Sequence, residues 1–123
     1  MRVKAQIEVV IDDEQSSAVD FVGHPIVLEE IMNAVKIHTQ KNHDYSGGDD
    51  PNGDPLSNFR GSKDFGVAPI TGLALRMGDK FKRIQTYIKT GKLKVENEGV
   101  KDAFRDLAVY SLLALALLSE EGE

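Results

Sequence analysis

The chain has 123 residues, of which 41% are hydrophobic and 28% charged, and it carries a net charge of -5 without any cysteine. These values are typical of one small globular domain, and they exclude a disulfide scaffold and cysteine-based zinc or nucleophile chemistry. The acidic balance also lacks the basic surface of a general nucleic-acid binder. We therefore expect a single domain over residues 1–123 that does not bind nucleic acid.

Residues 1–24 form an N-terminal extension whose one clear element is a strand. Apolar and polar side chains alternate from Val3 to Ile11, which is typical of a half-buried strand. A lone strand needs a partner, and three alternatives stay open: pairing across an oligomer, a marginal hairpin with Val19–Val22, or irregular structure. Charged residues interrupt the segment, so it does not have the pattern of a signal peptide.

The first helix is expected to begin after Pro25 and to end near His43. Its apolar residues recur at spacings of three and four, the pattern of an amphipathic helix. They are Val27, Leu28, Ile31, Met32 and Val35. A loop over 46–70, rich in glycine and proline, is expected to follow, and loops of this length in small domains are usually functional or mobile.

A second helix is expected from Pro69 or Thr71 to about Lys89, with Gly91 as its C-cap. Gly78 in its middle costs about 1 kcal/mol relative to alanine. Its presence indicates either a close helix crossing or a nearby ligand.

The third helix is expected to begin near Glu98 or Val100 and to end at about Ser119. Its second half is apolar around the whole circumference, which a three-helix monomer cannot easily bury, so we expect a homodimer or homotetramer. The apolar run Leu107–Leu118 is shorter than the roughly 20 residues of a membrane-spanning helix. The fold class is therefore mainly α, a three-helix core over 27–118 with a short N-terminal β-strand, in a soluble cytoplasmic protein without a membrane partner.

Three carboxylates at the start of the third helix are candidate metal ligands. Glu98, Asp102 and Asp106 follow one another at intervals of four residues and share one stripe of the helix. Mg²⁺, or Mn²⁺ in its place, would convert the repulsion between them into attraction, since these ions prefer oxygen ligands. The alternative is an exposed acidic first turn favoured by the helix dipole, with Lys101 and Arg105 neutralising its charge.

The second helix carries the complementary charges. Arg76, Lys80 and Arg83 surround Asp79 within about 100° of the helix circumference. One carboxylate among three cations fits a metal ligand with phosphate-binding neighbours. The alternative is a row of salt bridges.

The end of the first helix supplies Lys41, Asp44 and Tyr45. Asp44 binds a metal or a base edge in one interpretation and caps backbone amides in the other. Tyr45 either stacks on a base or belongs to the core.

The loop tripeptide Asn58-Phe59-Arg60 offers an amide for a base edge, a ring for stacking and a guanidinium for phosphate. It would otherwise be a small apolar anchor that holds the loop. Other templates fail, because the chain has no phosphate-binding glycine loop ending in Lys-Ser/Thr and its three histidines lack zinc spacing.

These groups follow one another in an order that resembles a known family. The chain is similar, over about residues 27–118, to small phage-encoded relatives of the MazG-like, all-α nucleoside triphosphate pyrophosphohydrolases and to nucleotide-modification-associated proteins. The residues that carry the resemblance are Lys41-Asn42-His43-Asp44-Tyr45, Asp54-Pro55, Asn58-Phe59-Arg60, Arg76-Met77-Gly78-Asp79-Lys80 with Arg83, Glu98, Asp102, Asp106-Leu107-Ala108 and Tyr110.

The resemblance implies a helical homo-oligomeric hydrolase that splits a (deoxy)nucleoside triphosphate into monophosphate and pyrophosphate with Mg²⁺. By position, Asp79, Glu98 and Asp102 would hold the metal, and one of them or Asp106 would act as general base. The residues that would bind the substrate are Lys41, Asp44, Tyr45, Asn58, Phe59, Arg60, Arg76, Lys80 and Arg83.

The chain departs from the family in one respect. The second helix of the family carries two or more glutamates, whereas this chain has Asp79 alone among cations. That difference keeps an alternative open, a non-catalytic phage protein that binds nucleotides or, through the apolar third helix, a host protein.

Overall fold

The computed structural model describes residues 1–12, 15–45, 53–93 and 99–121, except for the side chains of Gln15 and Tyr45. Its elements follow in the order β1, β2, α1, α2, a 3-10 helix, α3 and α4. The chain divides into two compact units, residues 1–35 and 36–123, and the boundary lies within α1. The structure is mainly helical with an N-terminal sheet, which confirms the fold class at that level.

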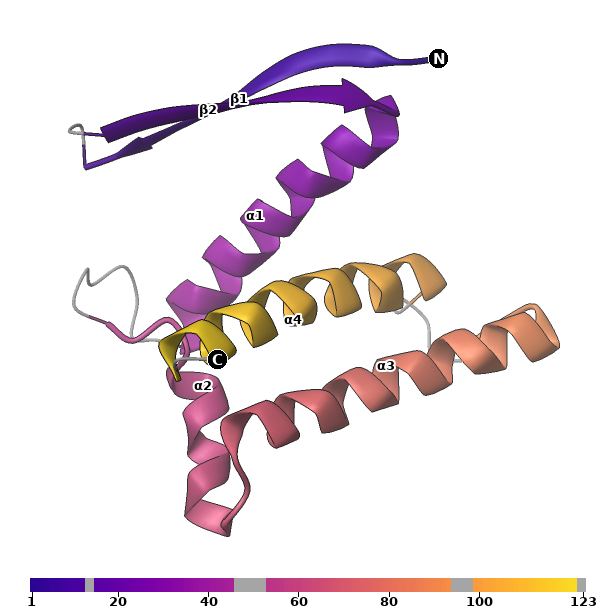
Figure 1. Ribbon diagram of the computed structural model, residues 1–123. Helices are drawn as coiled ribbons and strands as arrows, with labels where there is room; N and C mark the ends of the chain where they lie inside the picture. The colour runs from indigo at the N-terminus through magenta and orange to yellow at the C-terminus, as the bar shows by residue number, and fades with distance from the viewer. Residues whose placement is uncertain (13–14, 46–52, 94–98, 122–123) are drawn as a thin grey trace. The chain divides into compact units, whose positions relative to one another are not determined.

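The first unit contains an antiparallel hairpin of β1 (Val3–Ile11) and β2 (Gln15–Gly23) (Figure 1). The register pairs Val3 with Gly23 and runs without interruption to the pairing of Ile11 with Gln15. Of the three alternatives for the N-terminal strand, the hairpin is therefore the one observed. Its second strand is longer than the Val19–Val22 segment because Ser16 and Ser17 also join the ladder.

Helix α1 spans Pro25–Tyr45 and begins where the sequence predicts. His24 precedes it and caps its first turn: the backbone N–H of Ile26 donates to Nδ1 of His24 at 3.0 Å. Pro25 fits the first helical position because it has no N–H to satisfy there. The apolar stripe expected on this helix remains largely exposed to solvent. The side chains of Val27 and Val35, for example, are 52% and 59% exposed.

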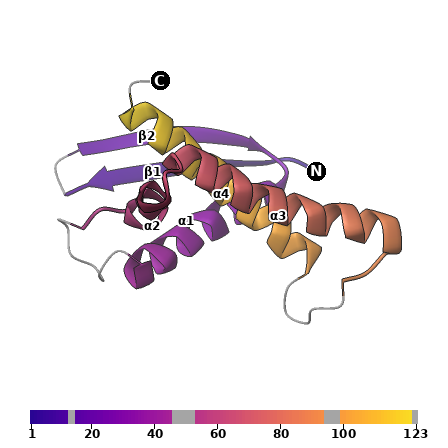
Figure 2. The same cartoon turned by 90° about the horizontal axis from the view of Figure 1, so that it is seen from below.

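The second unit is built on two antiparallel helices, α3 (Pro69–Thr90) and α4 (Val100–Glu120), which run side by side in both views (Figure 1, Figure 2). Gly91 ends α3 with φ of 77°, as its C-cap position predicts. The buried side chains among the described residues are apolar, and they are Leu56, Phe59, Pro69, Leu73, Ile84, Ala103, Val109, Leu113 and Leu117.

The prediction of a loop over 46–70 is wrong for its second half, which is largely helical. Helix α2 (Ser57–Arg60) continues directly into a 3-10 helix (Gly61–Phe65). Two apolar side chains explain this, since Leu56 and Phe59 are buried and so fix the segment. Residues 46–52 lie outside the described part of the chain.

The glycine that allows a close helix contact is Gly72, whereas the sequence indicated Gly78. A Cβ atom built at Gly78 meets no described atom within 4 Å, so no helix crosses closely there. At Gly72 a Cβ would come within 3.1 Å of Cβ of Ser62, where α3 passes the 3-10 helix. Gly72 therefore lets these two segments pack closely.

Arg60 joins α2 to the end of α4. Its Nε donates to Asp54 at 2.7 Å, and one of its two terminal nitrogens donates to Glu120. Asp54 also accepts the N–H of Leu56 at 3.0 Å. That backbone hydrogen bond, and then the Arg60 guanidinium, hold the pKa of the Asp54 carboxyl below its usual value of 3.8.

Because the pKa of Asp54 is lower in the folded chain than in the unfolded one, its contribution to stability is complete above the unfolded pKa. That contribution is lost as the pH falls through the folded pKa. We expect Asp54→Asn to reduce the loss of thermal stability on acidification from about pH 5 to about pH 2.5. Melting curves of the wild type and the variant measure this, and parallel curves would contradict it.

Candidate functional site

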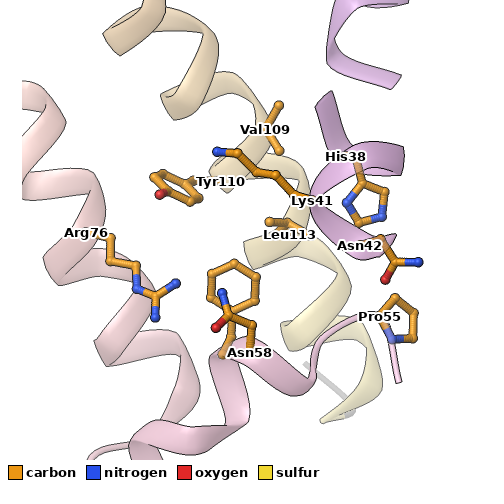
Figure 3. Close-up of a pocket in the computed structure, with 10 residues that line it drawn as sticks. His38, Lys41, Asn42, Pro55, Asn58, Arg76, Val109, Tyr110 and Leu113 are labelled. Atoms are coloured by element: carbon orange, nitrogen blue, oxygen red, sulfur yellow. The ribbon is translucent and has the colours of Figure 1, made fainter. Parts of the chain in front are cut away.

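The second unit contains a pocket of about 280 Å³ between α1, α2, α3 and α4, which we name the aromatic pocket (Figure 3). Helix α1 lines it from one side, α3 from the other, and α2 and α4 close it between them. The lining residues are His38, Lys41, Asn42, Pro55, Asn58, Phe59, Arg76, Val109, Tyr110 and Leu113.

Two aromatic rings with a cation over each form one wall of the aromatic pocket. The ring of Phe59 meets that of Tyr110 edge to face, at 6.3 Å between centroids and an interplanar angle of 86°. The Arg76 guanidinium lies 4.9 Å from the Phe59 centroid, and Nζ of Lys41 lies 5.8 Å from that of Tyr110. This wall presents flat apolar surface beside positive charge, a combination suited to a planar, anionic ligand.

Arg76 differs from the other cations of the site in having no acidic partner. In the described ranges no carboxylate lies within 4 Å of its guanidinium, although the whole chain is acidic. Figure 3 shows Arg76 extending from α3 toward the amide of Asn58 on α2. A guanidinium in this setting retains its capacity for bidentate binding of phosphate or carboxylate.

Asn42 contributes a polar group that the folded chain leaves unsatisfied. Its amide oxygen is buried, and within the part of the chain that the structure describes it has no hydrogen-bond partner. A buried acceptor in this state costs folding free energy. Proteins retain such costs mainly at sites that need the group.

Replacing Asn42 by leucine, which is branched at the same carbon atom but has no polar atom, is therefore expected to raise the free energy of unfolding by about 1 kcal/mol. Urea denaturation of the ligand-free protein measures this change. Gln40→Leu serves as the control for helix propensity and added apolar surface, because Gln40 is exposed on the same helix. Equal changes in the two variants would remove the unsatisfied oxygen as the cause.

A second cavity of about 250 Å³, the charged hollow, adjoins the aromatic pocket and shares Lys41 with it. Its lining residues are Ile37, Gln40, Lys41, Lys80, Arg83, Gly99, Asp102, Ala103 and Asp106. Three of these side chains are cationic and two are acidic, so the hollow has a local net charge of one positive within an acidic chain.

Asp106 is the central acid of the charged hollow. Its two carboxylate oxygens lie 3.0 Å from Nζ of Lys80 and 3.6 Å from Nζ of Lys41, and its side chain is only 20% exposed. One carboxylate thus joins α4 to both α1 and α3. The spacing of charges in the sequence does not identify Lys41 and Lys80 as its partners.

Asp102 has a structural task at the start of α4. It accepts the N–H of Gly99 at 3.3 Å, which caps the helix, and it pairs with Arg105 at 3.1 Å, as the alternative of an acidic first turn predicts. Its carboxylate nevertheless lines the charged hollow one turn before Asp106.

The described carboxylates fit a magnesium ion only in part. Asp102 and Asp106 supply oxygen donors on successive turns, but both already bind cations. Of the residues that the structure describes, no three acidic or histidine side chains converge. Glu98, the third member of the expected stripe, lies outside the described residues.

The structure brings together most of the expected substrate residues. Asn58, Phe59, Arg76 and Lys41 line the aromatic pocket, and Lys80 and Arg83 join Lys41 in the charged hollow.

The remaining expected residues lie apart from both cavities or cannot be placed. Asp79 is exposed on α3 and lines neither cavity. Asp44 is exposed and bonds Nδ1 of its neighbour His43 at 3.2 Å. Arg60 holds α2 to α4, which was the anchor interpretation of its tripeptide, and the side chain of Tyr45 is not described.

Asn42 and His38 were not predicted from the sequence as lining residues. Both face the aromatic pocket from α1, together with Lys41 (Figure 3). Their spacing of four residues, with Lys41 between them, was the available signal, because it places all three on one side of a helix.

Comparisons with protein-family models, with curated proteins and with solved structures give no match to this chain. None of the described helices combines the length and apolar character that crossing a membrane requires.

Proposed function

We propose that the chain is a (deoxy)nucleoside triphosphate pyrophosphohydrolase, which releases monophosphate and pyrophosphate in phage nucleotide metabolism. The observation that carries the proposal is the joining of two cavities of different chemistry at Lys41. One offers aromatic rings and amides, as a nucleoside requires, and the other offers cations, as phosphates require. Together they reach the size usual for small-molecule sites.

In this proposal the base enters the aromatic pocket against Phe59 and Tyr110, and Asn58 reads its polar edge. Lys41, which lines both cavities, binds the phosphate nearest the sugar together with Arg76 of the aromatic pocket. Lys80 and Arg83 bind the outer phosphates, which become pyrophosphate. The positive charges of Lys80 and Arg83 stabilise the negative charge that develops on the leaving pyrophosphate.

Asp79, Glu98 and Asp102 would hold Mg²⁺ or Mn²⁺, and of these Asp102 lines the charged hollow. When bound, such an ion neutralises phosphate charge and makes water a better nucleophile. Asp106 holds two ammonium groups in the structure. When phosphates bind Lys41 and Lys80, the Asp106 carboxylate is released to accept a proton from the attacking water.

A specific observation favours a second candidate, a nucleotide-binding protein without turnover. Asp106, whose side chain is 20% exposed, is neutralised by two lysines, and Asp102 is held by Arg105 and the helix start. A site organised in this way binds anions without presenting a ready set of metal ligands.

Incubating the protein with a panel of ribo- and deoxyribonucleoside triphosphates and Mg²⁺ or Mn²⁺ separates the two candidates. Monophosphate with pyrophosphate supports the hydrolase and identifies its base. Nucleotide-dependent thermal stabilisation without products supports the binding protein. If neither product nor stabilisation appears with any nucleotide, both candidates fail and an interaction with a host protein becomes the better hypothesis.

The double variant Glu98→Ala/Asp102→Ala tests the proposed ligands directly. We expect it to abolish turnover while overall helix content and oligomeric state stay nearly the same, because the contacts of Asp102 support only the first turn of α4. Circular dichroism and light scattering provide these controls. A double variant with full activity would show that the reaction does not use these carboxylates.

We also propose that the chain assembles as a homodimer or homotetramer in the cytoplasm. Phe104, Leu112 and Leu115 are 56–62% exposed on the side of α4 that faces away from its buried residues. A second copy would cover this apolar surface. A monomer in light scattering would contradict the assembly and favour the host-protein alternative.

A further inference from the structure

We propose that β1 pairs through its outer edge with the outer edge of β1 in a second copy of this chain. The two hairpins then form one four-stranded antiparallel sheet. This inference concerns the first unit alone and is independent of the nucleotide proposal.

The hairpin has the two properties that invite such pairing. In the described part of the chain the sheet contains β1 and β2 only, so each nine-residue strand has one edge without a strand partner (Figure 1). An isolated two-stranded sheet is marginally stable, and an open edge offers unpaired N–H and C=O groups to another strand.

One face of the hairpin is also apolar and incompletely covered. The register places Val9, Ile11 and Val19 on the same face as Ile7 and Phe21, because directly paired residues point to one side. Val9, Ile11 and Val19 are 44%, 53% and 63% exposed. Pairing two hairpins brings these faces into one continuous surface.

Charge complementarity selects the β1 edge and fixes its register. The opposite face of β1 carries Lys4, Gln6 and Glu8, followed by Val10 near the end of the strand. A twofold axis at Gln6 places Lys4 of each copy opposite Glu8 of the other. The two copies then form two opposite-charge pairs around a pair of glutamines, which stabilise the sheet.

The edge of β2 offers no such arrangement. Asp20 is the one charged residue of β2, so a twofold axis at that residue would oppose two carboxylates. Any other register would leave Asp20 without an oppositely charged partner. The positions of the charged residues therefore support pairing through the edge of β1 and exclude pairing of two β2 edges.

Contacts inside the hairpin predict different effects from contacts between copies. Gln6 pairs with Asp20, so positions 4 and 8 are both diagonal neighbours of that carboxylate. Glu8→Lys would improve the hairpin on its own, because it places a cation near Asp20. In the proposed sheet the same substitution sets the new ammonium group opposite Lys4 of the other copy, and so weakens association.

Sedimentation of the full chain over a range of concentrations tests this. We expect Lys4→Glu and Glu8→Lys each to raise the dissociation constant about tenfold or more, because each variant converts two attractive pairs into repulsive ones. An equimolar mixture of the two variants should associate as tightly as the wild type, since every pair is again opposite in charge. Variants that associate like the wild type, or a mixture no tighter than the single variants, would overturn the proposal.

A cross-linking experiment tests the register itself. The chain has no cysteine, so Gln6→Cys introduces a single thiol at the proposed axis. Directly paired residues of antiparallel strands lie within disulfide reach, and mild oxidation should give a covalent dimer. Asp20→Cys, on the same face but on β2, is the matched control and should remain uncross-linked. Failure of Gln6→Cys to cross-link, or equal cross-linking of both variants, would overturn the register.

Discussion

Replacing Leu117 by alanine is expected to lower the free energy of unfolding by about 2–5 kcal/mol. Leu117 is fully buried on α4, in the core that α4 forms with α3. The substitution removes the apolar contacts of the side chain and leaves a cavity that the packed helices fill only in part. Because a domain of this size has a total stability of roughly 5–15 kcal/mol, the loss is a large share of it.

Leu115→Ala is the matched control for this measurement, since it makes the same chemical change two residues earlier. Leu115 is 62% exposed, and we expect its replacement to change stability by less than about 0.5 kcal/mol in dilute protein. If a second copy covers the outer face of α4, Leu115→Ala will weaken association at higher concentration instead. Equal losses in urea denaturation of the two dilute variants would contradict the assignment of the buried face.

The helix boundaries could be predicted from the sequence because local chemistry determines them. Pro25 and Pro69 suit first helical turns, and Gly91 adopts the left-handed conformation that ends α3. These signals depend on backbone geometry at single positions, so distant residues do not alter them. They confirm a mainly helical fold, whereas a MazG-like core remains a prediction.

The helical segment 57–65 could not be predicted in the same way. Its composition of glycine, serine and polar residues is typical of a loop, and the apolar anchors Leu56 and Phe59 are few. These anchors become decisive only when α3 and α4 supply the surface that buries them. Arg60 adds a bond to Glu120, which is 60 residues away in the chain.

The candidate site shows the same division between local and distant information. Helix periodicity was sufficient to group Arg76, Lys80 and Arg83 on one helix face. The pairing of Asp106 with Lys41 and Lys80 depends on how three helices pack, which periodicity does not determine. The residue types at the site were therefore predictable, whereas their partners were not.

Replacing Asp106 by asparagine is expected to lower turnover about 100-fold or more, because the proposed general base is lost. The same change should strengthen nucleotide binding without metal several-fold. In the wild type, phosphates must compete with Asp106 for Lys80, at 3.0 Å, and for Lys41, at 3.6 Å. Asparagine has nearly the same shape but no charge, so both ammonium groups become available to the ligand.

Measuring turnover and metal-free nucleotide affinity on the same preparation separates the two roles of Asp106. Asp64→Asn removes one negative charge at an exposed position of the 3-10 helix, and it controls for the change in net charge. Weaker binding in Asp106→Asn would mean that the carboxylate itself holds the ligand. Tighter binding in a protein that shows no turnover in either form would favour the nucleotide-binding candidate, because Asp106 would then limit access to the lysines without taking part in a reaction.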